Sequence, residues 1–166
     1  MDITIKKLTD ISVMQRACEM TMKENKSSKI TLEKIYFCEH SPIQTQVFWI
    51  EILGIPTFVS VHLVRHKIGV THFVESNRED LGGNGIANRL TPVNHGMFIN
   101  AQALINMARK RLCFKTHKDT RKVMEAIKNK MENIDPDLSK FMIAECDYRN
   151  SCHELKSCGR FVKGVK

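Results

Sequence analysis

The sequence predicts one domain of the α/β (α+β) class, in which short strands and amphipathic helices follow one another along the chain. Its 166 residues suit a single domain with a sizeable core. Hydrophobic residues make up 42% and charged residues 27% of the chain, as in a folded protein rather than a disordered one. Strand-like alternation and helix-like periodicity both occur, and no repeat, low-complexity tract or linker divides them, so residues 1–166 are read as one domain.

Periodicity and capping residues place the elements. Strands are predicted over Asp2–Leu8, Val47–Leu53 and Val70–Val74. Helices are predicted over Ile11–Lys23, Leu32–Glu39, Pro56–Lys67, Met97–Phe114 and His117–Asn133, with a further short helix beginning at Asp135. Asp10 and Thr31 are expected to cap the first two helices, and Gly54 to end the second strand. The glycine-rich stretch Asp80–His95 is predicted to be a long loop, either a lid or a disordered excursion.

The net charge of +8 predicts an anionic partner. Nucleic acid and phosphorylated small molecules are the two candidates. The chain has only one tryptophan and two tyrosines, which argues against a base-stacking platform, and no helix-turn-helix, zinc knuckle or RNP pattern is present. On charge alone nucleic acid is the first of these candidates and phosphorylated small molecules are the second.

A basic cluster within Val61–Arg78 is the strongest single feature. If the predicted helix runs to Lys67, then His62, Arg65 and His66 stand at positions i, i+3 and i+4 and share one face. Cations and imidazoles crowded on one face repel each other unless an anion lies between them, which favours a phosphate site. The alternative is a solvated basic helix end, because cations are favourable near a helix C-terminus in any case.

The redox state of the six cysteines depends on the cellular compartment. No apolar run is long enough to span a membrane and the N-terminus has no secretory h-region, so we expect a cytoplasmic protein with reduced thiols. Cys146, Cys152 and Cys158 could make a zinc site, but their spacing is unlike a tight knuckle, and structural thiols without metal are favoured. Cys113 is expected to be buried as a small hydrophobe, and His72 to be a core histidine with satisfied hydrogen bonds.

Several motifs, in their order along the chain, resemble those of the flavin-dependent thymidylate synthases. Arg65-His66-Lys67 followed by Ser76-Asn77-Arg78 is similar to the family's Arg-His-Arg triplet and Ser-x-Arg. His40–Gln44 resembles its His-x-x-Pro-Phe-Glu segment, and Asn100–Asn106 with Arg111 resembles its Asn-x-Arg…Asn…Arg helix. Ala87–Pro92 is similar to Ala-Arg-x-x-Leu-Pro, and the segment around Cys152 and Cys158 looks like the endings of some members.

The resemblance implies a fold with a central mixed sheet flanked by helices. It also implies a homotetramer, with flavin at the subunit interfaces, that converts dUMP to dTMP with methylenetetrahydrofolate as carbon donor, FAD as cofactor and NADPH as reductant. By the same resemblance, FAD would be bound by Arg65, His66, Lys67, Asn100, Asn106 and His40. The nucleotide would be bound by His62, Ser76, Asn77, Arg78, Arg89 and Arg111, of which Arg111 and Ser76 would be catalytic. Arg111 would polarise the uracil and stabilise the negative charge that develops when C5 becomes nucleophilic.

Some positions depart from the family pattern. Lys67 replaces the second arginine of the triplet, which loses a bidentate fork, and Gln102 and Glu79 replace an arginine and a tyrosine. Two alternatives therefore stay open. One is a divergent homologue, such as a virus-encoded member resident in the host cytoplasm, that makes another pyrimidine nucleotide modification such as hydroxymethylation. The other is a non-catalytic protein that binds nucleic acid or acts as a scaffold.

Overall fold

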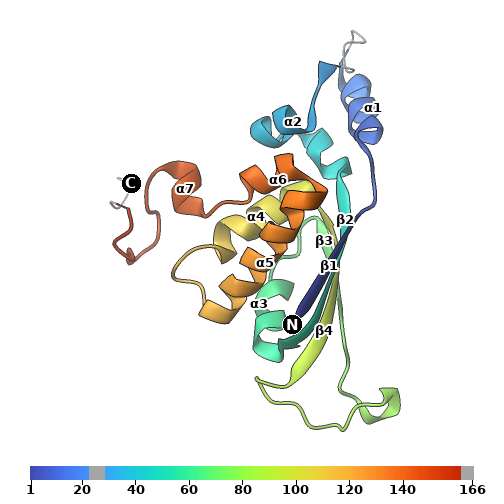
Figure 1. Cartoon of the computed structure of the whole chain (residues 1–166), viewed down its shortest axis with the longest axis vertical. Coiled ribbons are helices and arrows are strands. Elements are labelled where there is room, and N and C mark those ends of the chain that lie inside the picture. The colour runs from blue at the N-terminus through green and yellow to red at the C-terminus, as the bar shows by residue number, and fades with distance from the viewer. Residues whose placement is uncertain (23–28, 162–166) are drawn as a thin grey trace.

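A sheet of four antiparallel strands forms the centre of the computed structural model, which describes residues 1–22 and 29–161 (Figure 1). The strands are β1 (Asp2–Lys7), β2 (Val47–Pro56), β3 (Val70–Val74) and β4 (Pro92–Asn100), in the spatial order β1-β2-β4-β3. The predicted class, with helices and strands in one fold, is confirmed. The implied sheet was mixed, whereas each pairing between the described strands is antiparallel.

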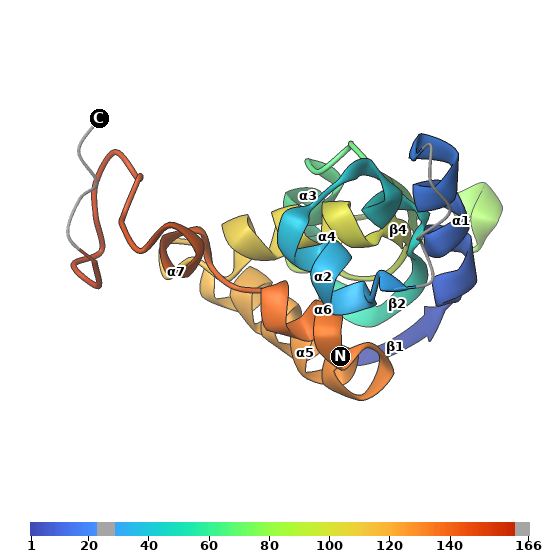
Figure 2. The same ribbon diagram turned by 90° about the horizontal axis from the view of Figure 1, so that it is seen from above.

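The helices lie mainly on one side of this sheet (Figure 1). They are α1 (Ile11–Thr21), α2 (Leu32–Cys38), α3 (Thr57–Val64), α4 (Ala101–Arg111), α5 (Lys118–Ile134), α6 (Pro136–Phe141) and α7 (Glu145–Arg149), with short 3-10 turns η2 (Ser41–Thr45) and η3 (Glu79–Leu81). Viewed from above, α7 and the segment after it stand apart from the sheet (Figure 2). None of the helices in the described part of the chain is long and apolar enough to cross a membrane.

Two predicted N-caps are confirmed. The Asp10 carboxylate accepts a hydrogen bond from the Ser12 amide at the start of α1, and the Thr31 hydroxyl accepts one from the Lys34 amide at the start of α2. The predicted end of the first helix, Lys23, lies outside the described residues.

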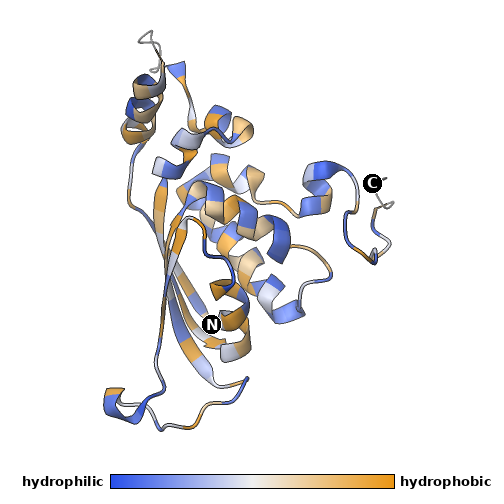
Figure 3. Cartoon of the chain, turned by 180° about the vertical axis from the view of Figure 1, so that it is seen from behind, coloured by the Kyte–Doolittle hydropathy of each residue, from blue (hydrophilic) through white to orange (hydrophobic). Residues whose placement is uncertain are grey.

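The core lies between the sheet and α3–α6. Alternate residues of the two central strands are buried, so hydrophobic and hydrophilic bands alternate along the strands in Figure 3. The buried residues of these strands are Phe48, Ile50, Ile52, Ile55, Val93, His95, Met97 and Ile99. The opposite face of the sheet carries Trp49, Phe73 and Phe98, which are only partly covered in a single chain.

The predicted boundary between loop and helix near residue 96 was wrong. Pro92–Asn100, divided in the prediction between a loop and the first turn of a helix, forms the central strand β4. The reason is that Val93, Met97 and Ile99 alternate inward, a period of two that the helical spacing of Ile99, Ala103 and Met107 concealed. The helix begins only at Ala101, because the Asn100 side chain accepts a hydrogen bond from the Ala103 amide and caps it.

Two further boundaries differ from the prediction. Gly54 does not end β2, which continues to Pro56 past an irregularity between Ile52 and Ile55. Gly54 has φ 68°, so it supplies the left-handed residue of this bulge rather than a stop. Helix α3 ends at Val64 rather than Lys67, so the basic cluster begins on the helix and continues beyond it.

Buried Asp135 fixes the N-terminal strand to the helical layer. Its carboxylate accepts hydrogen bonds from Lys7 Nζ (2.6 Å) and the Tyr36 hydroxyl (2.8 Å) and also caps α6 through the Leu138 amide (3.0 Å). Burial and the neighbouring Asp135 carboxylate raise the pKa of Tyr36, which keeps its hydroxyl a donor. Strand β1 and helices α2 and α6 are therefore joined at one charged residue.

Candidate functional site

An open cleft of about 510 Å³ lies between the ends of α3 and α4 and the loop that follows α4. We call it the basic cleft; its lining residues are His62, Arg65, His66, Lys110, Arg111, Cys113, Lys115, Thr116, His117 and Glu154. Four of them are lysine or arginine and three are histidine, against one carboxylate. The prediction that His62, Arg65 and His66 share one face is confirmed, since all three line the cleft although the helix is shorter than expected.

Arg111 is the best-fixed cation of the basic cleft. It is half-buried at the last position of α4, where its Nε donates a hydrogen bond to His66 Nε2 (2.9 Å) and its Nη2 donates one to the His62 carbonyl (2.6 Å). These two bonds hold the guanidinium plane against α3. Burial and the nearby Arg65 lower the pKa of Arg111 because both disfavour its positive charge. A bound anion would stabilise that charge.

The bond from Arg111 sets the protonation state of His66. Because the guanidinium can only donate, His66 Nε2 must accept, and a neutral ring then carries its proton on Nδ1. Burial and the Arg111 charge lower the pKa of His66 to about 4. At neutral pH His66 is therefore a neutral acceptor that orients Arg111.

A second histidine chain supports the cleft from inside the sheet. His72 Nε2 donates to the His66 carbonyl (2.7 Å), which leaves His72 Nδ1 as the acceptor for His95 Nε2 (2.9 Å). His95 Nδ1 then accepts from the Ser60 hydroxyl (2.8 Å). Burial and, second, His72 lower the pKa of His95 to about 4, which keeps His95 neutral at neutral pH. His72 thus has both ring nitrogens paired, as predicted.

Phe58 contacts two further basic side chains: His117, which lines the cleft, and Arg89, which lies beside it. The Arg89 guanidinium lies over the Phe58 ring (5.1 Å to its centroid), and the same ring packs against His117 (4.7 Å) and His62 (5.7 Å). His62 Nδ1 also shares a hydrogen bond with the Thr120 hydroxyl on α5 (2.8 Å). Burial, Arg111 and His117 lower the pKa of His62, so protonation of the His62 ring is disfavoured.

The lysine and arginine side chains of the basic cleft form no ion pairs with carboxylates of the described residues. Within residues 1–22 and 29–161, no carboxylate forms an ion pair with Arg65, Lys110, Arg111 or Lys115. The structure also shows no group of three or more histidine, cysteine or acidic side chains arranged to hold a metal ion among the residues it describes. The arrangement favours anion binding through charge and hydrogen bonds.

The Ser76-Asn77-Arg78 motif lies elsewhere, in a projecting loop of residues 75–91 (Figure 1). Ser76 and Asn77 line a separate hollow that shares no residue with the basic cleft. Arg78 is exposed and paired with Asp80 (2.5 Å). The loop is ordered by its own bonds: Asn77 Nδ2 donates to Asn84 Oδ1 (2.9 Å) and to the Ile86 carbonyl (2.5 Å).

The predicted flavin-binding asparagines and His40 are also outside the basic cleft. Asn100 is used as the N-cap of α4, and exposed Asn106 accepts from Gln102 and Arg109 (3.4 Å each). His40 is exposed and lines an apolar hollow beside α2. The chain by itself therefore assembles Arg65, His66, His62 and Arg111 in the cleft, with Arg89 beside them on Phe58, and the other predicted ligand residues do not line it.

Lys110, Lys115 and His117 also line the cleft and were not predicted as site residues. The signal that could have found the two lysines is the run of lysines and arginines that ends α4 and continues into α5. Cys113 was also misplaced, because it is half-exposed on the wall of the cleft rather than buried.

No family model matches the chain, and no curated protein matches its sequence. Its fold is shared with solved structures, among them thymidylate synthase X from Helicobacter pylori with FAD and dUMP, at TM-score 0.71 and 14% identity over 86% of this chain and 99% of that one. A second structure of that enzyme gives TM-score 0.68 at 14% identity, over 86% and 100%. A UMP/dUMP methylase from Streptomyces cacaoi bound with 5-Br dUMP gives TM-score 0.62 at 11% identity, over 86% and 97%. At these identities the likeness establishes the fold, which is that of the flavin-dependent thymidylate synthases.

Proposed function

We propose that this chain is a flavin-dependent thymidylate synthase that converts dUMP to dTMP, with FAD as cofactor, methylenetetrahydrofolate as carbon donor and NADPH as reductant. The observation that carries the proposal is the placement of Arg111. Its guanidinium donates two hydrogen bonds to neutral groups, which hold it at the wall of a cleft whose other cations have no carboxylate partner among the described residues. The shared fold of proteins that bind FAD and dUMP supports the same reading.

The residues present fit the charges of these ligands. FAD carries a pyrophosphate, dUMP a phosphate and the folate a carboxylate tail, and each would compensate cations that have no carboxylate partner in the described chain. Arg65, His66 and Lys67 would hold FAD, while His62, Arg89 and Arg111 would hold the nucleotide. Bound FAD would supply the hydride chemistry, and the chain would bind and orient the reactants.

Arg111 would act on the pyrimidine by electrostatic stabilisation. A fixed guanidinium beside the pyrimidine oxygens stabilises the negative charge that develops as C5 becomes nucleophilic. Neutral His66 would accept the Arg111 hydrogen bond and so hold the guanidinium in place, without a positive charge of its own that could attract the anion. No thiol nucleophile is needed in this scheme, which suits a cleft whose single cysteine, Cys113, has no base bonded to it among the described residues.

The projecting loop would complete the site in an assembly. Ser76 and Asn77 line a different hollow from Arg111, and Arg78 is exposed on the same projecting loop, so the three do not join Arg111 within one chain. In our proposal they reach the nucleotide bound by another copy, which requires an oligomer, and we propose the homotetramer. Ser76 would then have its catalytic role across the subunit interface.

Product analysis tests this proposal and separates it from a related reaction. The purified protein is incubated with FAD, NADPH, methylenetetrahydrofolate and dUMP, and with dCMP in a parallel reaction. Mass spectrometry that detects dTMP supports the proposal. A hydroxymethyl nucleotide would assign the related modification, and unchanged nucleotide despite bound flavin would contradict the synthase reading.

A further inference from the structure

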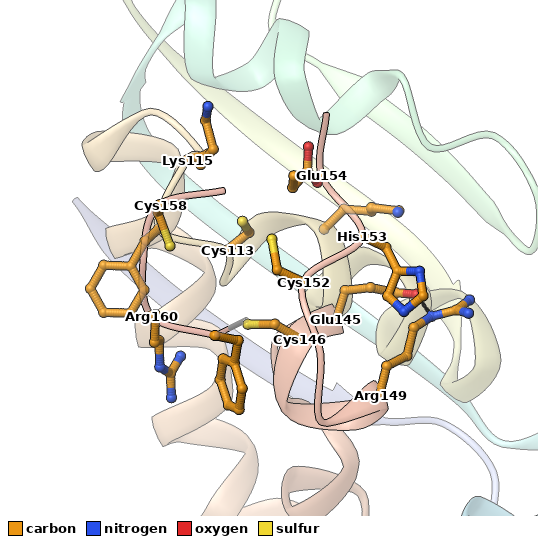
Figure 4. A pocket seen from close by; sticks show the side chains of 13 residues that line it. Cys113, Lys115, Glu145, Cys146, Arg149, Cys152, His153, Glu154, Cys158 and Arg160 are labelled. Atoms are coloured by element: carbon orange, nitrogen blue, oxygen red, sulfur yellow. Dashed lines mark hydrogen bonds and ion pairs between the residues drawn. The ribbon is translucent and has the colours of Figure 1, made fainter. Parts of the chain in front are cut away.

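A pocket of about 200 Å³ beside the basic cleft brings four cysteines together from separate segments of the chain (Figure 4). Cys113 lies in the turn after α4 and Cys146 on α7, and Cys152 and Cys158 follow in the C-terminal segment. Figure 4 shows their side chains gathered around one space, with sulfur atoms turned toward its interior. All four thiols are free. We call this the cysteine pocket.

We propose that Cys113, Cys146, Cys152 and Cys158 bind one Zn²⁺ as a tetrahedral structural site. Four thiolates are a donor set that zinc takes in structural sites, and they satisfy its coordination without water. On binding, each thiol releases its proton to solvent, so the four S–H bonds are replaced by four Zn–S bonds with no change in oxidation state. In the conformations described, no three such side chains are arranged to hold an ion. In our proposal, zinc binding would draw the four sulfur atoms together by rotation of the cysteine side chains about χ1, which has three staggered positions.

The charge around the cysteine pocket suits this ion. A zinc ion with four thiolates has a net charge of −2. The pocket is lined by four cations, Lys110, Lys115, Arg149 and Arg160, and by two carboxylates, those of Glu145 and Glu154. The lysine, arginine and glutamate side chains of the lining therefore have a net charge of +2, which offsets the charge of the zinc–thiolate group.

The C-terminal segment, residues 150–161, has little packing of its own, so a metal crosslink would fix its position. After α7 the described chain to residue 161 has no helix or longer strand, and apolar Leu155 is 89% exposed. Its position rests on a few surface contacts, including Arg160 with Asp147 (2.8 Å) and the Lys156 carbonyl with Lys115 (3.1 Å). Exposed ion pairs contribute little, and short segments without a core are commonly fixed by a metal or a disulfide.

The proposed zinc site would stabilise one wall of the basic cleft. The cysteine pocket and the cleft share Lys110, Cys113, Lys115 and Glu154. Zinc would fix the turn that carries Cys113 against the C-terminal segment, and so hold these charged side chains in position. The spacing of the last three cysteines alone did not predict this, because the fourth ligand comes from a distant turn.

Metal analysis of the full-length protein is the first test. The protein is purified under reducing conditions without chelator, and zinc is measured by elemental analysis and native mass spectrometry. We expect about one zinc per chain. We also expect that replacement with Co²⁺ gives the sulfur-to-cobalt charge-transfer and visible bands of a tetrahedral thiolate site. A metal-free protein that gives no such bands with added Co²⁺ overturns the proposal, as does a mass deficit that shows disulfides between these cysteines.

Variants then identify the ligands. Cys158→Ser, which changes an exposed cysteine, should lower zinc content and weaken the cobalt charge-transfer band, whereas Cys38→Ser, an exposed cysteine away from the pocket, should leave both unchanged. Equal zinc content in Cys158→Ser, Cys113→Ser and the wild type would contradict the four-cysteine site. Because zinc content is measured without flavin or nucleotide, this test is independent of the proposed enzyme activity.

Discussion

The basic cleft and the projecting loop hold their charged residues in different ways. Arg111 in the cleft is bonded to His66 and to the His62 carbonyl, and the histidine chain behind them ends at buried Ser60 in the core. Arg78 in the loop is exposed and paired only with its neighbour Asp80 among the described residues, while the loop is ordered by bonds within itself.

From this contrast we infer different roles for the basic cleft and the projecting loop. The cleft is preorganised by one folded chain, so its cations keep their geometry before any ligand arrives, at the cost of placing like charges together. The loop presents Ser76 and Arg78 away from the body, where they are available to another copy. In the proposed enzyme, one chain therefore supplies the fixed half of a site and a neighbour supplies the other half.

The largest effect is expected at the fixed half. Arg111→Ala should lower turnover by about 100- to 1,000-fold and leave FAD bound, because it removes a preorganised charge that acts in the transition state. Steady-state kinetics and the flavin spectrum measure the two effects. Arg16→Ala, which removes an exposed arginine paired with Glu19 on α1, is the matched control and should retain activity. Near-normal turnover of the Arg111 variant would remove this residue from its catalytic role.

A smaller effect, on binding, is expected at the loop. Arg78→Ala should weaken dUMP binding by about 10- to 100-fold through loss of a charged hydrogen bond, while FAD affinity changes little. Calorimetric titration of each ligand measures both. The melting temperature should stay near that of the wild type, since the side chain is exposed. A greater loss of FAD than of dUMP affinity would contradict our division between the two ligands.

The histidine chain is expected to affect stability. His95→Phe should lower the free energy of unfolding by about 1–3 kcal/mol, because it leaves the Ser60 hydroxyl and His72 Nδ1 without their partner. Denaturant unfolding measures the loss, and His40→Phe, at an exposed histidine, is the control. An unchanged unfolding midpoint would mean that the chain Ser60–His95–His72 contributes nothing to the fold.

The buried histidines also predict that the stability of the fold depends on pH. His66 and His95 have pKa values of about 4 in the folded protein against an ordinary value of 6.5. Between these values the unfolded chain binds protons that the folded chain does not, so stability should be complete above pH 6.5 and fall as the pH is lowered toward 4. His95→Phe should flatten this fall, as measured by thermal unfolding at several pH values. An equal slope in the variant would assign the dependence to other groups.

The smallest effect concerns the turn that joins the basic cluster to β3. Gly69 has φ 73°, and a Cβ there would lie 2.6 Å from Asn100 Nδ2. Gly54 has a similar φ of 68° but open space around it. Gly69→Ala should therefore cost about 1 kcal/mol more than Gly54→Ala, because only the first displaces the N-cap of α4. Equal melting temperatures for the two variants would show that the Asn100 contact has no influence.

Capping residues and hydrophobic periodicity predicted those elements whose conformation is set by neighbouring residues in the sequence. The caps Asp10 and Thr31 and the strand Val70–Val74 were found as expected. The strand β4 was missed because its neighbours β2 and β3 impose its extended form, and its Gly96 and Asn94 have weak strand preference.

The candidate site was predictable only in part, for a similar reason. His62, Arg65 and His66 are close in sequence, so their shared face could be read directly from spacing. The pairing of His66 with Arg111 and the chain to His95 join residues 45 and 23 positions apart, which no local pattern encodes. Likewise, the fourth member of the cysteine pocket comes from a turn far from the other three.

Flavin binding by the purified full-length protein tests the central claim most directly. FAD is titrated into the protein while the visible absorbance spectrum is followed, and NADPH and then dUMP are added. For the wild type we predict a bound-flavin spectrum that bleaches with NADPH and shifts with dUMP. For Arg111→Ala we predict bound flavin with turnover lowered by about 100- to 1,000-fold. Absence of flavin binding with excess FAD, together with salt-sensitive binding of DNA, would contradict the account and assign the basic cleft to nucleic acid.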